Sequence, residues 1–270
     1  MRFHKLEEFI RTPLGMQMLG IGKGSADFAQ LVRDAQKFYV GDVCAFEGIL
    51  QPQDFPRLPY PMCVFEFQDV DPKGISRPFF LLCEEIGDSD PAYDSVRVHS
   101  FIPYPTPADM DDLWLHSGWV EVNRETNTYD SFVNKNTLKF LDAGDGFNRL
   151  ADANTIDQSI ISSAQWLCRF LAVLNCSNVE LAEVDEPKFL NKKRQKKGRV
   201  PIYSYKTLVL KTRQQRLATG GGTHESPRIH LRRGHIKRRK TGNFWWQPCV
   251  VGDRKKGIVV KDYRADGLVA

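Results

Sequence analysis

A segment near the C-terminus, HLRRGHIKRRK, places two histidines among arginines and lysines. Histidine moves protons near neutral pH, and cations stabilise phosphate charge. Metal-independent RNA cleavage uses these kinds of side chain together. One group removes the proton of the ribose 2′-hydroxyl, a second group protonates the leaving oxygen, and a cation stabilises the charged intermediate. The candidate catalytic residues are His230, His235, Arg232, Lys237 and Tyr263.

The geometry of this segment depends on how residues 228–240 form a strand. Strict alternation places Ile229 and Leu231 on one face and Ile236 on the other. A bulge at Gly234, a common meaning of an isolated glycine in a strand, shifts the register by one and returns Ile236 to the core side. With that bulge, both histidines and the intervening Arg232 share the opposite face.

The simpler interpretation of the same region is a basic surface that binds nucleic acid without cutting it. Cations neutralise phosphates and aromatic rings stack on unpaired bases. We expect RNA rather than DNA, because aromatic residues among the cations suit unstacked bases and no helix-turn-helix or zinc-finger pattern is present. The predicted nucleic-acid-binding residues are Lys192, Lys193, Arg194, Lys196, Lys197, Arg233, Arg238, Arg239, Lys240, Trp245, Trp246 and Lys261.

Metal and cofactor chemistry has little support in the sequence. His224, His230, His235 and Cys249 are suitable zinc ligands by type, but their spacing matches no zinc motif. We therefore expect no metal and no cofactor. Elsewhere, His99 and His116 lie in apolar strand-like runs, where a structural role is expected and an acid–base role is the alternative.

The distribution of charge separates the chain into two parts. Residues 1–187 hold 15 Lys and Arg against 29 Asp and Glu, a net charge of −14, whereas residues 188–270 hold 23 against 4, a net charge of +19. Together these give the +5 of the whole chain. A basic part of this strength indicates a polyanionic partner, because phosphate neutralisation releases counterions.

The elements expected in the first part are a helix and a set of short antiparallel strands. Apolar residues recur at helical spacing between Ser25 and Tyr39, and alternating or apolar runs follow between Pro, Gly and Asp clusters. The expected strands are 62–67, 79–83, 96–102 and 118–122.

The second part begins with a well-marked helix, because Thr155 and Gln158 fit a capping box and an apolar stripe runs from Ile156 to Leu174. Strands are expected at 178–184 and 200–210, with the basic run 188–199 as an exposed loop between them. The strands 228–240, 244–251 and 257–264 would form a meander, with turns at 241–243 and 252–256. The fold class is therefore α+β: an acidic α+β domain over 1–150, followed over 151–270 by a basic domain of a helix and a small antiparallel sheet.

Three stretches of the second part carry a resemblance: LNCSNVE, LNKKRQKKGRVPIYSYKTL and SPRIHLRRGHIKRRK with the following WWQPCVVGDRKKGIVVKDY. They resemble the C-terminal part of uncharacterised proteins common in bacteriophages and other bacterial mobile elements, over roughly residues 165 to 265. The resemblance implies a phage or mobile-element setting and transfers no catalytic residue.

The function expected is therefore that of a phage or mobile-element protein that binds nucleic acid through its basic domain, with RNA cleavage as a further hypothesis. The alternative is a non-enzymatic phage protein that binds or inhibits a host defence or nucleic-acid-processing complex, whose acidic face could then mimic nucleic acid. We expect a cytoplasmic location in the bacterial host and no membrane partner, because no apolar run is long enough to cross a bilayer. The scattered cysteines are expected to be reduced core thiols.

Overall fold

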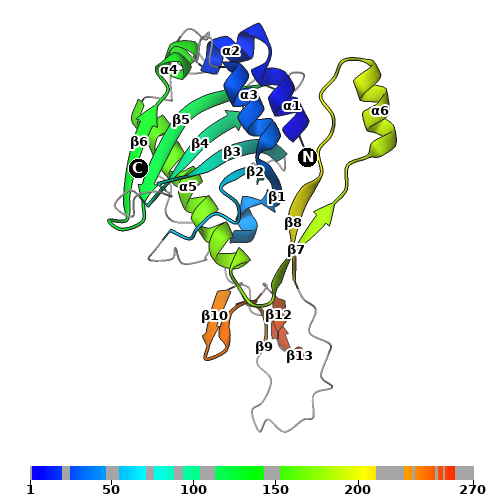
Figure 1. Ribbon diagram of the computed structural model, residues 1–270. Coiled ribbons are helices and arrows are strands. Elements are labelled where there is room, and N and C mark those ends of the chain that lie inside the picture. The colour runs from blue at the N-terminus through cyan, green and yellow to red at the C-terminus, as the bar shows by residue number, and fades with distance from the viewer. Residues whose placement is uncertain are drawn as a thin grey trace.

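An eight-stranded mixed sheet forms the centre of the computed structural model (Figure 1). The structure describes residues 2–19, 25–46, 55–70, 76–87, 94–103, 113–142, 153–210, 228–232, 235–246, 249–251 and 253–258. The strands of the large sheet are β1 (Gln36–Asp42), β2 (Met62–Val70), β3 (Ser76–Ile86), β4 (Ser95–Pro103), β5 (Trp114–Asn123), β6 (Thr128–Val133), β7 (Val179–Val184) and β8 (Tyr205–Leu210). Helices combined with a large sheet confirm the predicted α+β class.

The strands lie in the order β6-β5-β4-β3-β2-β1-β8-β7. Strands β2 to β6 pair antiparallel, so the four strands expected between residues 62 and 122 are confirmed. Strand β1 is parallel to both β2 and β8, and β7 is antiparallel to β8. Elements from before and after residue 150 therefore share one sheet, and the division into two domains stays a prediction.

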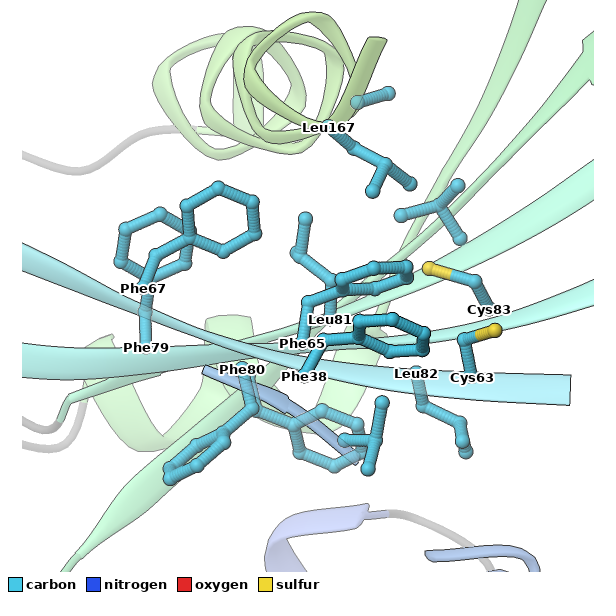
Figure 2. Close-up of a cluster of buried hydrophobic side chains, with 14 of the residues drawn as sticks. Phe38, Cys63, Phe65, Phe67, Phe79, Phe80, Leu81, Leu82, Cys83 and Leu167 are labelled. Atoms are coloured by element: carbon cyan, nitrogen blue, oxygen red, sulfur yellow. The ribbon is translucent and has the colours of Figure 1, made fainter. Parts of the chain in front are cut away.

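Helices cover both faces of the large sheet (Figure 1). The described helices are α1 (Phe3–Ile10), α2 (Pro13–Leu19), α3 (Ser25–Asp34), the 3-10 helix η1 (Val43–Phe46), α4 (Lys135–Asp142), α5 (Ala153–Leu174) and α6 (Lys188–Lys196), and α6 stands apart from the sheet. On one face, α1 places Phe3 against Phe80. On the other face, α5 places Phe170 against Phe65, and Figure 2 shows Leu167 of the same helix above the apolar side chains of the sheet.

The long helix α5 has the apolar stripe that its sequence predicts. Ile156, Ile160, Ala164, Leu167 and Leu171 are all buried, although the helix begins at Ala153, two residues before the predicted capping residue. The helix passes close to β5 at Gly118. A Cβ atom there would lie 2.1 Å from the carbonyl oxygen of Phe132 and 2.9 Å from Ile160, and the φ angle is +144°. Only glycine satisfies both conditions.

The helix predicted for residues 25–39 is wrong over its last five residues. Helix α3 ends at Asp34, and β1 begins at Gln36. Phe38 is fully buried and stacks on Phe65 of β2, with ring centroids 5.0 Å apart. Strand pairing and this aromatic contact override a spacing that also fitted a helix.

The basic C-terminal region forms two small sheets instead of one meander. Their strands are β9 (Arg228–Arg232), β10 (His235–Arg239), β11 (Gly242–Trp246), β12 (Cys249–Val251) and β13 (Asp253–Ile258). Strand β10 pairs with β11, whereas β9 lies between β12 and β13. The single strand predicted for 228–240 is therefore wrong, and so is the turn predicted at 252–256, because β13 occupies most of it. A hairpin forms near the turn predicted at 241–243, but the two-residue turn is Lys240 and Thr241, because Gly242 and Asn243 already belong to β11.

Four cysteines behave as the sequence predicts. Cys63, Cys83, Cys168 and Cys176 are free and buried, and burial raises the pKa of the Cys63 thiol to about 12. These thiols are therefore protonated and inert at neutral pH. Among the helices that the structure describes, none is long and apolar enough to span a membrane.

Candidate interaction surface

Strands β7 and β8 run out from the edge of the large sheet and carry helix α6 at their far end (Figure 1). We call residues 185–204 the arm. The exposed loop predicted for 188–199 is wrong, because Lys188–Lys196 is an α-helix. Its Lys, Arg, Gln and Leu residues have high helix propensity, but it has no apolar stripe to reveal the helix.

One side of α6 is fixed to the chain that returns toward β8. Asn191 is buried, and its side-chain amide exchanges two hydrogen bonds with the backbone of Ile202. The Asn191 amide donates to the Ile202 carbonyl at 2.8 Å, and the Ile202 amide donates to Asn191 Oδ1 at 2.7 Å. This pair of bonds sets the rotation of the helix about its own axis.

A second anchor lies one helical turn later and joins the arm to α1. Arg194 donates to Glu8 Oε1 through Nη2 at 2.7 Å and to the Val200 carbonyl through Nε at 2.7 Å. The Val200 amide donates to the same Glu8 oxygen at 3.0 Å. Arg194, expected from the sequence to contact nucleic acid, is thus directed inward, with a side chain only 14% exposed. An open pocket of about 520 Å³ lies beside this anchor and is lined by Phe9, Arg194 and Arg199 among others.

The base of the arm is held by a buried carboxylate. Glu7 of α1 is fully buried, accepts a hydrogen bond from Arg33 of α3 at 2.7 Å, and accepts another from the hydroxyl of Tyr203. The Nζ of Lys37 lies 4.3 Å above the Tyr203 ring, and burial lowers the pKa of Lys37 to about 8. These contacts make the arm continuous with the folded core.

The outer side of α6 faces solvent and carries an aromatic residue among lysines. Lys192 and Lys193 lie three and four residues after Phe189, and Lys196 lies four and three residues after them, so the four residues share one face, which we call the outer face. Phe189 is 73% exposed, and the Lys193 ammonium lies 4.4 Å from its ring centroid. Among the residues that the structure describes, no carboxylate pairs with these lysines. The sequence interpretation missed Phe189. The feature that could have revealed it is its helical spacing to Lys192, Lys193 and Lys196.

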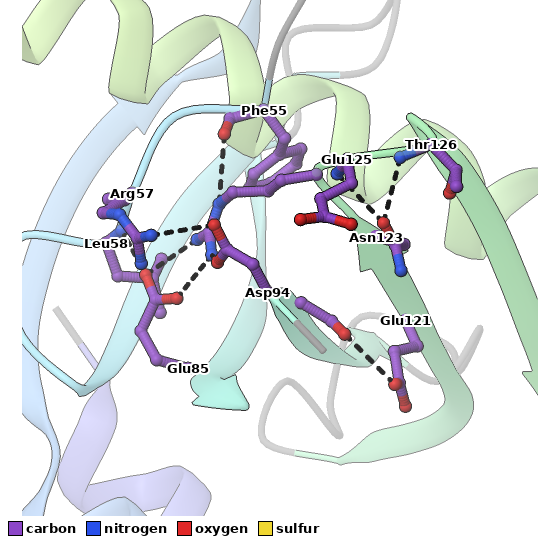
Figure 3. Close-up of polar contacts among 11 residues, drawn as sticks. Phe55, Arg57, Leu58, Glu85, Asp94, Glu121, Asn123, Glu125 and Thr126 are labelled. Carbon is purple, nitrogen blue, oxygen red and sulfur yellow. Dashed lines mark hydrogen bonds and ion pairs between the residues drawn. The ribbon is translucent and has the colours of Figure 1, made fainter. Parts of the chain in front are cut away.

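The carboxylates of the acidic part include an ion-paired cluster at the ends of β3 and β5 (Figure 3). Arg124 pairs with Glu85 at 2.7 Å and with Asp94 at 2.6 Å, and its side chain is only 8% exposed. Arg57 adds a further pair to Asp94 at 2.8 Å, and the Leu58 amide donates to Glu85. These charges bind one another and connect the strands.

A second basic surface lies on the β10–β11 hairpin. Arg238, Arg239 and Lys240, predicted to bind nucleic acid, are exposed there. The hairpin is fixed to the loop after α5, because the Ser177 amide donates to the Asn243 carbonyl at 2.7 Å. Ile236 packs against the core, as the sequence predicts.

The catalytic hypothesis depended on one strand with a bulge at Gly234, and that strand does not form. His230 and Arg232 belong to β9, whereas His235 and Lys237 belong to β10 of the other small sheet. Several predicted residues have side chains outside the described part of the chain: His230, Arg232, Arg233, His235, Trp245, Trp246, Lys261 and Tyr263. Whether the two histidines meet is therefore still a hypothesis. Among the described residues, no three His, Cys, Asp or Glu side chains form a possible metal site.

His99 and His116 form a buried pair beneath α3. The Nδ1 of His99 lies 3.3 Å from Nε2 of His116, and the Asn134 side-chain amide lies 3.3 Å from Nδ1 of His116. Burial, with a smaller contribution from His99, lowers the pKa of His116 to about 3. His116 therefore stays neutral at physiological pH and packs against the half-buried ring of Phe28, which favours the structural role expected from the sequence.

Comparison with known proteins places the chain in a family. Residues 47–255 match the AcrVA2-like family, described as anti-CRISPR type V subtype A2. The chain belongs to this family. The match spans β2 to β8 and most of the small sheets, so it includes both the ion-paired cluster and the arm. No curated protein and no solved structure gives a match. Membership agrees with the phage setting that the sequence implied, and it favours an interaction with host defence over a nuclease.

Proposed function

We propose that the chain protects a phage from the type V CRISPR system of its bacterial host by binding a component of that system inside the cell. The family match carries the proposal. The arm supports it, because an anchored helix with an exposed Phe189 and unpaired lysines is a surface typical of partner recognition. This is the non-enzymatic alternative drawn from the sequence, and it now becomes the main hypothesis.

A plasmid-transformation assay tests the proposal. Cells that carry a type V CRISPR system targeting the plasmid should accept it when they express the chain and reject it when they do not. Capture of a purified effector–guide complex on the immobilised chain gives the direct counterpart. If the chain neither restores transformation nor retains any component of the system, the proposal fails.

The second candidate function is nucleic-acid binding, with RNA preferred to DNA. The exposed cations of α6 and of the β10–β11 hairpin favour it, because cations on a protein surface bind phosphate backbones with a strong dependence on salt. The residues assigned to this role are Lys192, Lys193, Lys196, Lys197 and the hairpin cations. The two functions are compatible, since RNA-guided effectors carry a guide RNA and displace a DNA strand.

RNA cleavage by His230, His235, Arg232, Lys237 and Tyr263 remains a narrower hypothesis within this second function. The residue types suit proton transfer without a metal. Incubating the purified chain with labelled RNA in a chelator, beside His230→Ala and His235→Ala variants, decides it. Intact RNA in every sample removes the nuclease and leaves binding alone.

A further inference from the structure

We propose that Phe189 is a stacking platform for a base of single-stranded nucleic acid, and that the lysines of the outer face bind the phosphates beside that base. The proposal rests on the second candidate function, and it adds the strandedness of the ligand and the residue that contacts the base. It applies to the α6 arm alone and requires no cleavage.

The exposure of Phe189 has no explanation within the fold. Phenylalanine side chains are commonly buried, yet this one is 73% exposed, the largest exposed fraction among the large hydrophobic side chains of the described residues. The helix is held by the polar side chains of Asn191 and Arg194 on its inner face, so Phe189 contributes nothing to that attachment. An aromatic ring left in water on an anchored helix is available to a ligand with a flat apolar face.

The charges around the ring indicate a polyanion. Between residues 188 and 199 the sequence contains seven Lys and Arg and no Asp or Glu. A helix rises about 1.5 Å per residue, so Lys192 and Lys196 are separated by roughly 6 Å along its axis. Stacked nucleotides rise about 3.4 Å each, so the two lysines can contact phosphates about two steps apart.

The ring also indicates single strands. In a duplex the faces of the bases are stacked on one another, whereas an unpaired base offers a face that an aromatic side chain can cover. Lys193 lies over one face of the Phe189 ring at 4.4 Å, so a base stacked on the opposite face would have a phosphate-binding cation beside it. An acidic protein would also satisfy the lysines, so capture of a purified effector protein is included below as the outcome that counts against a nucleic acid.

The anchors make this surface rigid before a ligand arrives. Asn191 is bound to Ile202 in both directions, and Arg194 is bound to Glu8 and Val200. A preorganised surface loses less entropy on binding than a mobile basic loop. The loop predicted from the sequence would bind phosphates only, whereas the helix holds the ring and the lysines in one register.

Fluorescence anisotropy with the full chain tests the proposal. The probes are labelled 12-nucleotide oligo(U) and oligo(dT), and a 12-unit abasic strand with the same phosphates. We expect Phe189→Ala to weaken binding of both oligonucleotides by about 5- to 100-fold, in line with the loss of one base–aromatic stack. Phe189→Trp should restore binding, and Leu190→Ala, which removes an exposed aliphatic side chain of the same helix, should have little effect.

The abasic strand and the salt dependence separate stacking from charge. On the abasic strand, wild type and Phe189→Ala should bind equally. Joint replacement of Lys192, Lys193 and Lys196 by Gln should make the fall of log affinity with log salt shallower by about two units of slope, whereas Phe189→Ala should leave this slope unchanged.

Each outcome has one meaning. If Phe189→Ala binds oligo(U) and oligo(dT) as wild type does, or loses as much affinity for the abasic strand, the stacking proposal is overturned. The stacking proposal is also overturned if Phe189→Ala binds both oligonucleotides normally but no longer captures a purified effector protein. If the triple Gln variant keeps the affinity and the salt dependence of wild type, the proposal that α6 binds nucleic acid fails. If wild type binds none of the strands, the stacking proposal and the second candidate function both fail.

Discussion

The Arg124 cluster and the α6 arm use charged residues in opposite ways. In the cluster, Arg124 is shielded from water and bound to Glu85 and Asp94 (Figure 3). On the outer face of α6, lysines stand in water without a carboxylate partner in the described structure. The comparison teaches that net charge alone does not locate function: paired charges hold this fold together, and unpaired charges on a rigid support are available to a partner.

The comparison predicts the largest loss of stability at Arg124. Replacing Arg124 with Gln leaves Glu85 and Asp94 without their shared partner, so the free energy of unfolding should fall by about 3 to 5 kcal/mol. Urea denaturation measures this. The control is Arg57→Gln, which removes a pair whose arginine is 67% exposed and should cost less than about 1 kcal/mol. Equal effects of the two variants would remove the distinction between the cluster and an ordinary surface pair.

Acid should also unfold the core through His116. Its folded pKa is about 3, below the unfolded value of about 6.5, so the unfolded chain binds more protons between these pH values. Its contribution to stability is therefore complete above about pH 6.5 and is lost as the pH falls toward 3, with a slope approaching about 1.4 kcal/mol per pH unit. Urea denaturation from pH 7 to 4 should show a shallower slope for His116→Asn. Parallel curves would show that other groups cause the acid sensitivity.

The anchor of the arm should have a smaller and local effect. Arg194→Gln removes the ion pair with Glu8 and should raise amide hydrogen exchange in α6, at a cost of about 1 to 2 kcal/mol. Exchange in β3 and β4 should be unchanged. If Arg194→Gln leaves exchange in α6 as it was, the helix is not held by this contact, and the contrast with a flexible basic loop disappears.

The outer face should contribute almost nothing to stability. Joint replacement of Lys192, Lys193 and Lys196 by Gln should change the free energy of unfolding by no more than about 0.5 kcal/mol, because these side chains pair with no carboxylate in the described part of the chain. Thermal and urea unfolding measure it. A loss comparable to that of Arg124→Gln would show that the lysines are structural after all.

The sequence predicted most of the strands and the long helix because their patterns are strong. The runs from Met62 to Val122 alternate or are wholly apolar, and α5 carries an uninterrupted apolar stripe. The early strand β1 was predicted as helix, because six apolar residues between Phe28 and Tyr39 fit a helical spacing before the parallel pairing is known. The parallel pairing of β1 with β8 joins residues far apart in the chain, and no local pattern encodes it.

The candidate surface was predicted in composition but not in shape. The lysines of 192–197 were identified as a binding region from charge alone. Their arrangement depends on Asn191 and Arg194, which bind the backbone of the returning chain, and neither contact can be derived from spacing. The isolated Gly234 was compatible with a bulge or with the end of a strand, and β9 and β10 lie on either side of it in different sheets.

The most direct test of the account compares two matched triple variants in the plasmid-transformation assay against a type V CRISPR system. One variant carries Gln at Lys192, Lys193 and Lys196 of the outer face, and the other carries Gln at Arg57, Arg77 and Lys135, which are exposed cations away from the arm. With protein levels matched, the account predicts that the second variant protects the plasmid as wild type does, and that the first loses most of the protection. Full protection by the outer-face variant would contradict the assignment of function to the arm.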